Sequence, residues 1–264
     1  MRECGFGLFS AKIIGSILAG DYFSHLDLGK NDLKNEGVLA LIKALRTNCS
    51  LIHLDIGSND ITYEGAAEMF RMLAKNRTLM SLTMANHDRL HRNRLGPKSC
   101  YELRNLLQEN QILQMVNIAD NGISNEGLKI LQPALTKNCI LVSLNLSNNE
   151  LTGIDSLVSY IRCSKHLMEL NLSYNKIGDT GGEELAKIFQ ENSSLLMKVD
   201  LSACELTARS VSKLFFALKS NNFLKYMNLN GNNLSGNGFD QVSILLWNNR
   251  RLEHLSLAQC KING

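Results

Sequence analysis

The stretch Leu51-Ile-His-Leu-Asp-Ile-Gly-Ser-Asn-Asp-Ile61 decides the fold, because its apolar and asparagine positions recur along the chain. Its repeated positions read L-x-x-L-x-L-x-x-N-x-L, with other apolar residues or cysteine in some copies. The copies begin 28, 28, 34, 28, 26, 29, 28 and 28 residues apart, and a near-constant period of this length is typical of stacked repeats. Their first positions are Phe23, Leu51, Leu79, Leu113, Leu141, Leu167, Leu196, Leu224 and Leu252.

A helix is expected in the second half of each copy. Counted from the asparagine position, apolar residues recur at +10 and +14, and a spacing of four places them on one helical face. Another asparagine returns at +17 in most copies, where it can end the helix. The apolar pairs are Leu41/Leu45, Met69/Leu73, Leu103/Leu107, Leu131/Leu135, Leu185/Phe189, Leu214/Leu218 and Val242/Leu246.

This pattern predicts an α/β solenoid. One strand–helix unit cannot bury its apolar face alone, so stacked units share a core and pair their strands in parallel. We expect one domain over residues 1–264 with nine strands on the concave face of a curved horseshoe segment and helices on its convex face. The chain begins and ends inside a repeat, with Ile14 and Leu18 at +10 and +14 of the first one. We therefore expect further repeats in a longer chain, or a hetero-complex that covers the ends.

The asparagine at the ninth position of the motif is predicted to point inward. Its amide can satisfy backbone groups where each chain segment leaves its strand. Cys204 and Cys260 occupy the same position and are expected to be small buried residues without redox chemistry. The asparagines are Asn31, Asn59, Asn93, Asn121, Asn149, Asn175 and Asn232.

A unit of about 28 residues with a full helix and an alternation of Asn and Cys resembles the ribonuclease-inhibitor-like class of leucine-rich repeats. That class includes ribonuclease inhibitors, sensing domains of NOD-like receptors, Ran GTPase-activating proteins, and axonemal or cytoskeletal scaffolds. The resemblance covers nearly the whole chain and implies the solenoid fold, whereas it leaves the function open among these members.

Composition narrows the choice of partners. The 264 residues are 44% apolar and 20% charged, with a net charge of +3, which is too close to neutral to indicate nucleic-acid binding. No apolar run is long enough to span a bilayer, so no membrane partner is expected. The seven cysteines show no zinc-site or Cys-x-x-Cys spacing, which favours reduced thiols in the cytoplasm, with a cytoskeletal or ciliary location as an alternative.

No catalytic motif is present, and we expect neither an enzyme nor a cofactor. The sequence lacks a P-loop, a Gly-x-Ser-x-Gly elbow, a His-Glu-x-x-His helix and a dinucleotide-binding fingerprint. His25 and His53 fall on adjacent strands with rings about 5 Å apart, but a metal site there would need further ligands, and Ser81 comes next. No metal site is predicted.

The first outward position of each strand is the best candidate for contacts with a partner. Strand alternation places this column on the concave face, and it varies in size and charge from copy to copy, as a recognition surface should. Merely solvated strand positions are the alternative, and Tyr226 is the expected centre of any hot spot. The candidate contacts are His25, His53, Met115, Glu169, Lys198, Tyr226 and His254.

Two further surfaces are candidates for protein binding. The 34-residue copy carries six extra residues between Met84 and Asn93, and insertions in solenoids map to loops on one face. This loop offers Arg89, His91, Arg92 and Arg94, which suit carboxylate or phosphate partners, although a solvated loop without a partner is equally compatible.

On the convex face, the helix positions at +12 and +15 change from polar to apolar at Phe216, Ile244 and Trp247. They predict an exposed apolar patch, with packing under a local loop or a further repeat as the alternative.

The function expected from these features is non-enzymatic. We expect a protein–protein interaction module or a scaffold subunit of a larger assembly, because a preformed surface binds partners without an ordering cost. The alternatives are a GTPase activator resembling the Ran-specific family, a ligand-sensing segment of an innate-immune receptor, and a ciliary or cytoskeletal subunit. The GTPase activator is disfavoured because no arginine matches that family's catalytic segment and no strongly acidic tail is present.

Overall fold

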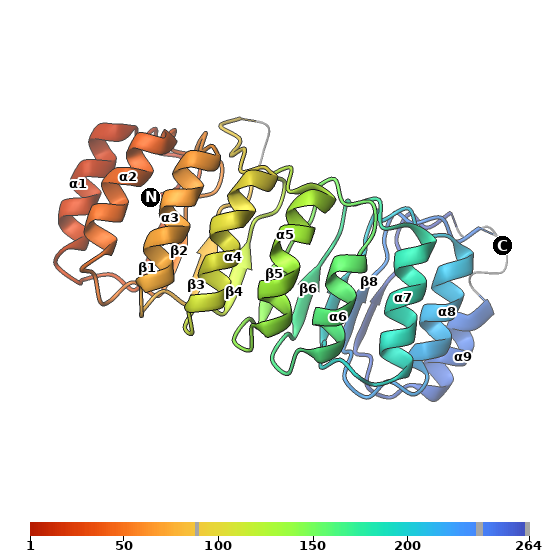
Figure 1. The fold of residues 1–264 in the computed structure, drawn as a ribbon. Helices are drawn as coiled ribbons and strands as arrows, with labels where there is room; N and C mark the ends of the chain where they lie inside the picture. Colours follow the sequence, from red (N-terminus) through yellow and green to blue (C-terminus); the bar gives the residue numbers. More distant parts are fainter. Residues whose placement is uncertain (88–89, 236–239, 262–264) are drawn as a thin grey trace. The chain divides into compact units, whose positions relative to one another are not determined.

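The structure, a computed structural model, describes residues 1–87, 90–235 and 240–261. The chain divides into two compact units, Met1–Leu141 and Val142–Gly264. Figure 1 shows helices and strands alternating along both units, with the first unit coloured red to yellow-green and the second green to blue. The expectation of one continuous domain over 1–264 stays a prediction.

The first unit contains four short parallel strands. Neighbouring strands pair so that equivalent residues of successive repeats lie opposite each other, as His25 does with His53. The strands are β1 (His25–Asp27), β2 (His53–Asp55), β3 (Ser81–Thr83) and β4 (Met115–Asn117). The helices, which pack side by side in chain order, are α1 (Leu8–Leu18), α2 (Lys34–Leu45), α3 (Tyr63–Lys75), the 3₁₀ turn η1 (Pro97–Ser99), α4 (Cys100–Glu109) and α5 (Ser124–Lys137).

The second unit repeats this arrangement. Its strands also pair in parallel and in chain order, and its helices again pack against their neighbours. The strands are β5 (Ser143–Asn145), β6 (Glu169–Asn171), β7 (Lys198–Asp200), β8 (Tyr226–Asn228) and β9 (His254–Ser256). The helices are α6 (Asp155–Cys163), α7 (Gly178–Gln190), α8 (Ala208–Leu218) and α9 (Asp240–Asn248).

Every strand begins two residues after the first position of its repeat, so the predicted repeat is confirmed to the residue. In β2 the middle residue Leu54 is buried at 2% exposure, while His53 and Asp55 on either side face outward. Burying one such leucine stabilises the fold by about 1.5–3 kcal/mol. The other strands up to β8 show the same alternation, and in β9 the middle residue Leu255 is half-buried. The outward positions form two columns of side chains, which we call the strand face.

The predicted asparagine ladder is confirmed. Asn59 is fully buried; its amide nitrogen donates to the carbonyl of Leu28 at 2.9 Å, and its amide oxygen accepts from the backbone N–H of Asn31 at 2.9 Å. Asn59 thus joins its repeat to the one before it, and Asn175 does the same in the second unit, where its amide donates to the carbonyl of Leu146 at 2.9 Å. Cys204 takes the same place, and its thiol donates to the carbonyl of Leu172 at 3.2 Å.

Irregular repeats change the helices locally. The 26-residue copy has a short helix, α6, of 9 residues, whereas α7 in the next copy has 13, as the repeat length predicts. Pro133 lies inside α5, which runs through it for 14 residues. Leu246 was expected in the core at +14, which is wrong: it is 54% exposed because α9 buries Leu245 instead, and no later described helix covers it.

Candidate protein-interaction surfaces

The strand face of the second unit carries an aligned run of three predicted contact residues. The rings of Tyr226 and His254 stack on adjacent strands with centroids 4.6 Å apart and planes 1° apart. The ammonium group of Lys198 lies 5.4 Å from the centroid of the tyrosine ring, within cation–π range. We call Lys198, Tyr226 and His254 the β7–β9 row. Parallel strand pairing holds it in place, so its side chains form a preordered amphipathic surface.

The strands before this row are more polar. Glu169 is exposed on β6, opposite Lys198 in the strand register, and its carboxylate accepts a hydrogen bond from the Ser143 hydroxyl at 3.2 Å. The second unit therefore presents a hydroxyl, a carboxylate, an ammonium and two rings in consecutive strands. That sequence of groups can recognise a polypeptide through hydrogen bonds and stacking together.

In the first unit the outward column is dominated by a histidine pair. The imidazoles of His25 and His53 stack with centroids 4.2 Å apart, and Met115 lies half-buried further along on β4. The pKa of His53 is lowered, first by burial and then by repulsion from His25. The stacking agrees with the predicted adjacency of the two rings. A role of His25 and His53 in contact with a partner stays a prediction.

The second outward column has a structural role. The side-chain oxygen of each Asp or Asn accepts from the backbone N–H two residues later, as in Asp55 with Gly57 at 2.8 Å and Asn171 with Ser173 at 2.9 Å. These hydrogen bonds close the turn that follows each strand. The Asp and Asn side chains of the second column thus hydrogen-bond to the backbone of their own turns. Residue type is therefore free to vary in the first column.

Sequence reasoning missed Arg2, which lies across this second column. Its guanidinium pairs with Asp27 at 2.8 Å and with Asp55. A methyl group at Gly29 would meet the Arg2 guanidinium at 2.8 Å, so the glycine leaves room for it. Burial pushes the pKa of Asp55 upward, but hydrogen bonds from His87 and Gly57 and the charge of Arg2 hold it below its ordinary value.

A signal for Arg2 was available in the repeat. Cys4 falls at the asparagine position of the first partial copy, so Arg2 falls where later copies have Gly29 and Gly57. An arginine side chain at a position otherwise held by glycine is too long to fit in the core, so it has to point outward. The nearest outward carboxylates in the following copies are those of Asp27 and Asp55, with which it pairs.

The insertion is anchored to its own chain. The backbone N–H of Asn93 donates to the side chain of Asn86 at 2.7 Å, and the Asn86 amide donates to the Asn93 carbonyl at 2.9 Å, which closes the neck of the loop. His91 pairs with Asp60, and Arg92 pairs with Asp120.

Two of the predicted basic groups in the insertion therefore already face carboxylates of this protein. Arg94 is exposed next to the backbone bridge that it makes with Thr62. Arg89 lies outside the described residues. A role of this loop in partner binding stays a prediction.

The predicted apolar patch is exposed on the helix side of the second unit. Phe216 on α8 is 53% exposed, and Ile244 and Trp247 on α9 are 39% and 79% exposed. The ammonium of Lys219 lies 4.9 Å from the centroid of the Phe216 ring. The exposure agrees with the expected geometry, while binding of a partner there remains untested.

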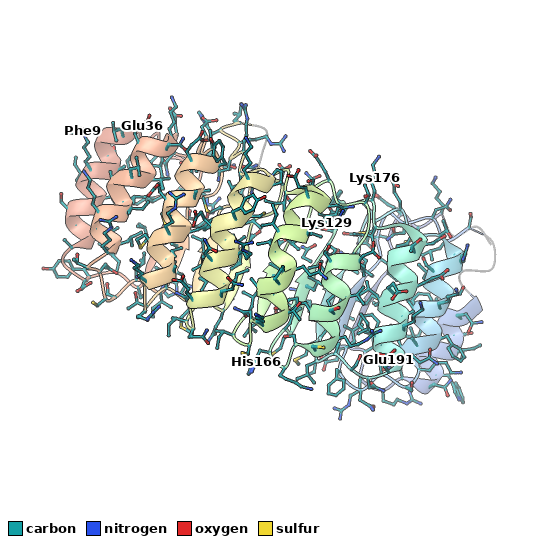
Figure 2. All side chains as sticks on the ribbon, viewed as in Figure 1. Phe9, Glu36, Lys129, His166, Lys176 and Glu191 are labelled. Atoms are coloured by element: carbon teal, nitrogen blue, oxygen red, sulfur yellow. The ribbon has the colours of Figure 1, made fainter. Side chains whose placement is uncertain are left out.

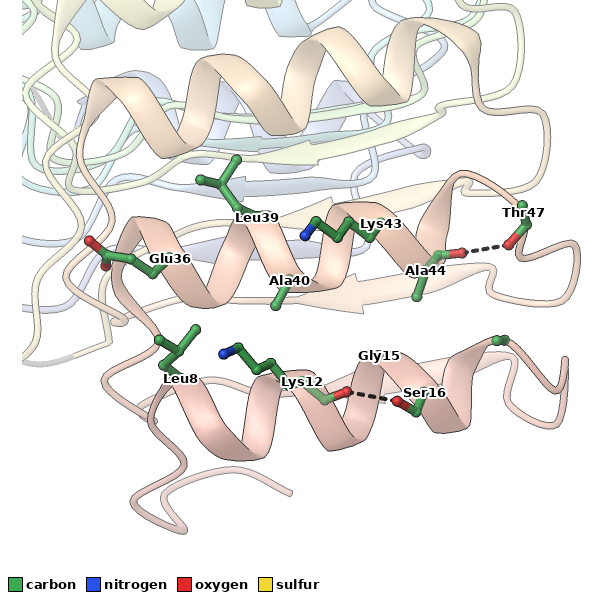
Figure 3. A pocket seen from close by; sticks show the side chains of 11 residues that line it. Leu8, Lys12, Gly15, Ser16, Glu36, Leu39, Ala40, Lys43, Ala44 and Thr47 are labelled. Atoms are coloured by element: carbon green, nitrogen blue, oxygen red, sulfur yellow. Dashed lines mark hydrogen bonds between the residues drawn. The ribbon is translucent and has the colours of Figure 1, made fainter.

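A groove between α1 and α2 lies on the helix side of the first unit (Figure 3). Its volume is about 590 Å³, and its lining is mostly apolar with Lys12, Lys43 and Glu36 along it. The hydroxyls of Ser16 and Thr47 donate to carbonyls of their own segments at 3.1 and 3.3 Å. On the outer side of α1, Phe9 is 76% exposed and is labelled in Figure 2.

The cysteines are all free thiols, three buried and four exposed. Burial raises the pKa of the Cys204 thiol to about 12, so it stays protonated at neutral pH and is a poor nucleophile. This agrees with the predicted structural role of the cysteine in the asparagine slot. Among the described residues, none of the helices is both long and apolar enough to cross a bilayer.

Comparison with known proteins agrees with the repeat geometry. The family pattern described as Leucine Rich repeat matches residues 22–41, 47–70, 109–131 and 163–186, and a second Leucine Rich Repeat pattern matches 141–159. The class defined by the fold and these matches is therefore the leucine-rich repeat proteins. Within that class, the chain is similar to ribonuclease inhibitors and to NACHT, LRR and PYD domains-containing proteins, which supports a ribonuclease-inhibitor-like type of repeat.

Two relatives illustrate this similarity. Human NACHT, LRR and PYD domains-containing protein 5 is 29% identical over 243 residues, which cover 90% of this chain and 17% of that protein. Mouse ribonuclease inhibitor is 30% identical over 148 residues, covering 55% of this chain and 32% of the inhibitor. The chain thus spans less than a third of the length of either relative.

One solved structure is also similar. The C-terminal domain of Caenorhabditis elegans tropomodulin matches with a TM-score of 0.47 at 13% identity, covering 58% of this chain and 88% of that one. A likeness this distant supports no statement about function.

Proposed function

We propose that the chain is a non-enzymatic protein-interaction module, a scaffold or recognition subunit that binds another protein through its strand face. The leucine-rich repeat homology supports an interaction module in general. The single observation that carries the finer proposal is the β7–β9 row, in which Lys198, Tyr226 and His254 are aligned and partly or fully exposed.

The physical argument is preorganisation. The row rests on paired strands, so a partner that docks on it does not pay for ordering a loop. Tyrosine supplies a large contact area with few rotatable bonds and is enriched among binding hot spots. A partner with a carboxylate for Lys198 and an apolar or aromatic group for the stacked rings would suit these side chains.

A reducing compartment is part of the proposal. Seven free thiols, four of them exposed, would be at risk of oxidation in a secreted protein. We therefore place the protein in the cytoplasm, and the interaction partners would be cytoplasmic proteins.

The proposal is tested by comparing two surface variants of the whole chain in protein capture from cytoplasmic extract. The double substitution Tyr226→Ser and His254→Ser changes the strand face, and Phe216→Ser with Trp247→Ser changes the helix face as a matched control. We expect the first variant to lose the captured proteins and the second to keep them. The opposite pattern would move the binding surface to the helices, and stimulation of GTP hydrolysis by small GTPases would contradict a non-enzymatic role.

A further inference from the structure

Two aspartates of the first unit occupy equivalent places in adjacent repeats. Asp32 and Asp60 each follow a buried ladder asparagine, and each has a left-handed backbone with φ of 55° and 54°. Equivalent conformations in neighbouring repeats direct the two carboxylates to the same side, at the edge where the chain leaves the strands. Both side chains remain partly exposed, at 41% and 33%.

The insertion brings an imidazole to these carboxylates. Nδ1 of His91 lies 2.7 Å from the nearer carboxylate oxygen of Asp60 and 3.7 Å from that of Asp32. A backbone hydrogen bond also holds His91 in place, because the N–H of Asp60 donates to the His91 carbonyl at 2.8 Å. One ligand atom from each of the three side chains lies within 4.8 Å of the other two. The six extra residues of the 34-residue repeat thus supply a nitrogen ligand that the regular repeats lack.

We propose that Asp32, Asp60 and His91 bind one divalent transition-metal ion of the zinc type. One imidazole nitrogen and two carboxylate oxygens form a ligand set that zinc accepts, with water in the fourth position. Ligand atoms about 2.0–2.2 Å from a tetrahedral ion lie roughly 3.3–3.6 Å apart. The Asp60–His91 contact therefore opens by less than about 1 Å, and the ion binds the imidazole through a nitrogen that carries no proton.

The neighbouring cation is compatible with this site. The ammonium of Lys34 lies 3.5 Å from the Asp32 carboxylate and would repel a metal ion. Its side chain is 57% exposed, so it can rotate into solvent when the ion arrives. Removal of this ammonium should therefore tighten metal binding, an effect that a purely structural ion-pair cluster would not produce.

Binding would tie the insertion to the two preceding repeats. An ion that binds the folded chain but not the unfolded chain stabilises the folded state. The gain in stability grows with the ion concentration relative to the dissociation constant. The role is structural, since it fastens the loop on the rim of the first unit. The inference is independent of the proposed partner on the second unit, so the failure of either leaves the other standing.

The test is calorimetric titration of the full chain with Zn²⁺ after its exposed thiols have been alkylated, because free cysteines compete for zinc. We expect one ion per chain. His91→Ala and Asp60→Asn should each weaken binding by more than about tenfold, since even the loss of an outer-shell partner costs about 10–100-fold. Lys34→Ala should bind more tightly than the wild type, and His53→Ala, which removes the other histidine cluster, should change nothing.

Two controls keep the result interpretable. Circular dichroism melting without metal should be the same for His91→Ala and the wild type, because this side chain is 45% exposed. With Co²⁺ in place of Zn²⁺, the absorption spectrum should show no thiolate charge-transfer band. The proposal is overturned if the alkylated chain binds no zinc, if His91→Ala binds as well as the wild type, or if His53→Ala abolishes binding.

Discussion

At the scale of single residues, each unit depends on buried side chains that connect one of its repeats to the next. Asn59 illustrates the requirement, since it donates to the carbonyls of Leu28 and Gly57 and accepts from the N–H of Asn31. Cysteine meets the same requirement at Cys204, whose thiol donates to Leu172. A residue that both donates and accepts can therefore occupy this slot, while a purely apolar residue would leave backbone groups unsatisfied.

Replacement of the ladder asparagine should follow that chemistry. We expect Asn59→Ala to lower the free energy of unfolding by about 2–3 kcal/mol, because buried backbone groups lose their partners. Asn59→Cys should cost clearly less, since a thiol can still donate to the carbonyl below it. Urea denaturation followed by circular dichroism measures both; equal losses for alanine and cysteine would contradict the ladder mechanism.

The histidine pair on the strand face predicts a pH effect. The pKa of His53 is held below its ordinary value by burial and by His25. The unfolded chain therefore binds this proton more readily than the folded chain, and the contribution to stability is lost as the pH falls below about 6.5. NMR titration should find the pKa of His53 below that value, and His25→Gln should raise it. A pKa that does not respond to His25→Gln would contradict the proposed coupling.

At the scale of elements, α8 and α9 combine a buried face with an exposed apolar one. Leu214 is fully buried on α8, whereas Trp247 is the most exposed large side chain of the patch. Phe216 and Ile244 lie between these extremes. Burial and exposure on these two helices therefore separate residues that stabilise the fold from residues that are free to bind.

A pair of alanine substitutions tests this separation. Trp247→Ala should change the free energy of unfolding by less than about 0.5 kcal/mol, whereas Leu214→Ala should cost about 2–5 kcal/mol through the cavity that it leaves. Thermal and urea unfolding measure both changes. Trp247 is the only tryptophan, so its fluorescence emission should also be that of a solvated indole. A large loss of stability in Trp247→Ala would place the side chain in the core.

At the scale of the whole molecule, the repeat period was sufficient to predict the position of every strand. Each begins two residues after the repeat's first position, and the buried asparagine and cysteine columns follow from the same count. Periodicity predicts these features because each copy repeats the environment of the one before it. The predicted exposure of Phe216, Ile244 and Trp247 rests on the same logic.

Features outside the period could not be predicted in this way. The contacts of His91 with Asp60 and of Arg92 with Asp120 join an insertion to residues 31 and 28 positions away, and no repeat template places an insertion. Arg2 is different, because the repeat register places it next to the glycine positions of later copies, although its two ion pairs with Asp27 and Asp55 were not predicted. Leu246 was placed in the core because the last helix was assumed to have the same neighbours as the others.

The most direct measurement of the central claim is site-specific photocrosslinking in cells of the proposed compartment. A photoreactive amino acid is placed singly at Lys198, Tyr226 or His254 on the strand face, and at Lys187 on α7 as the helix-face control. We predict that the three strand-face positions crosslink to the same partner protein and that Lys187 does not. Crosslinks confined to the helix face, or none from the β7–β9 row, would contradict the proposal that this chain binds proteins through its strands.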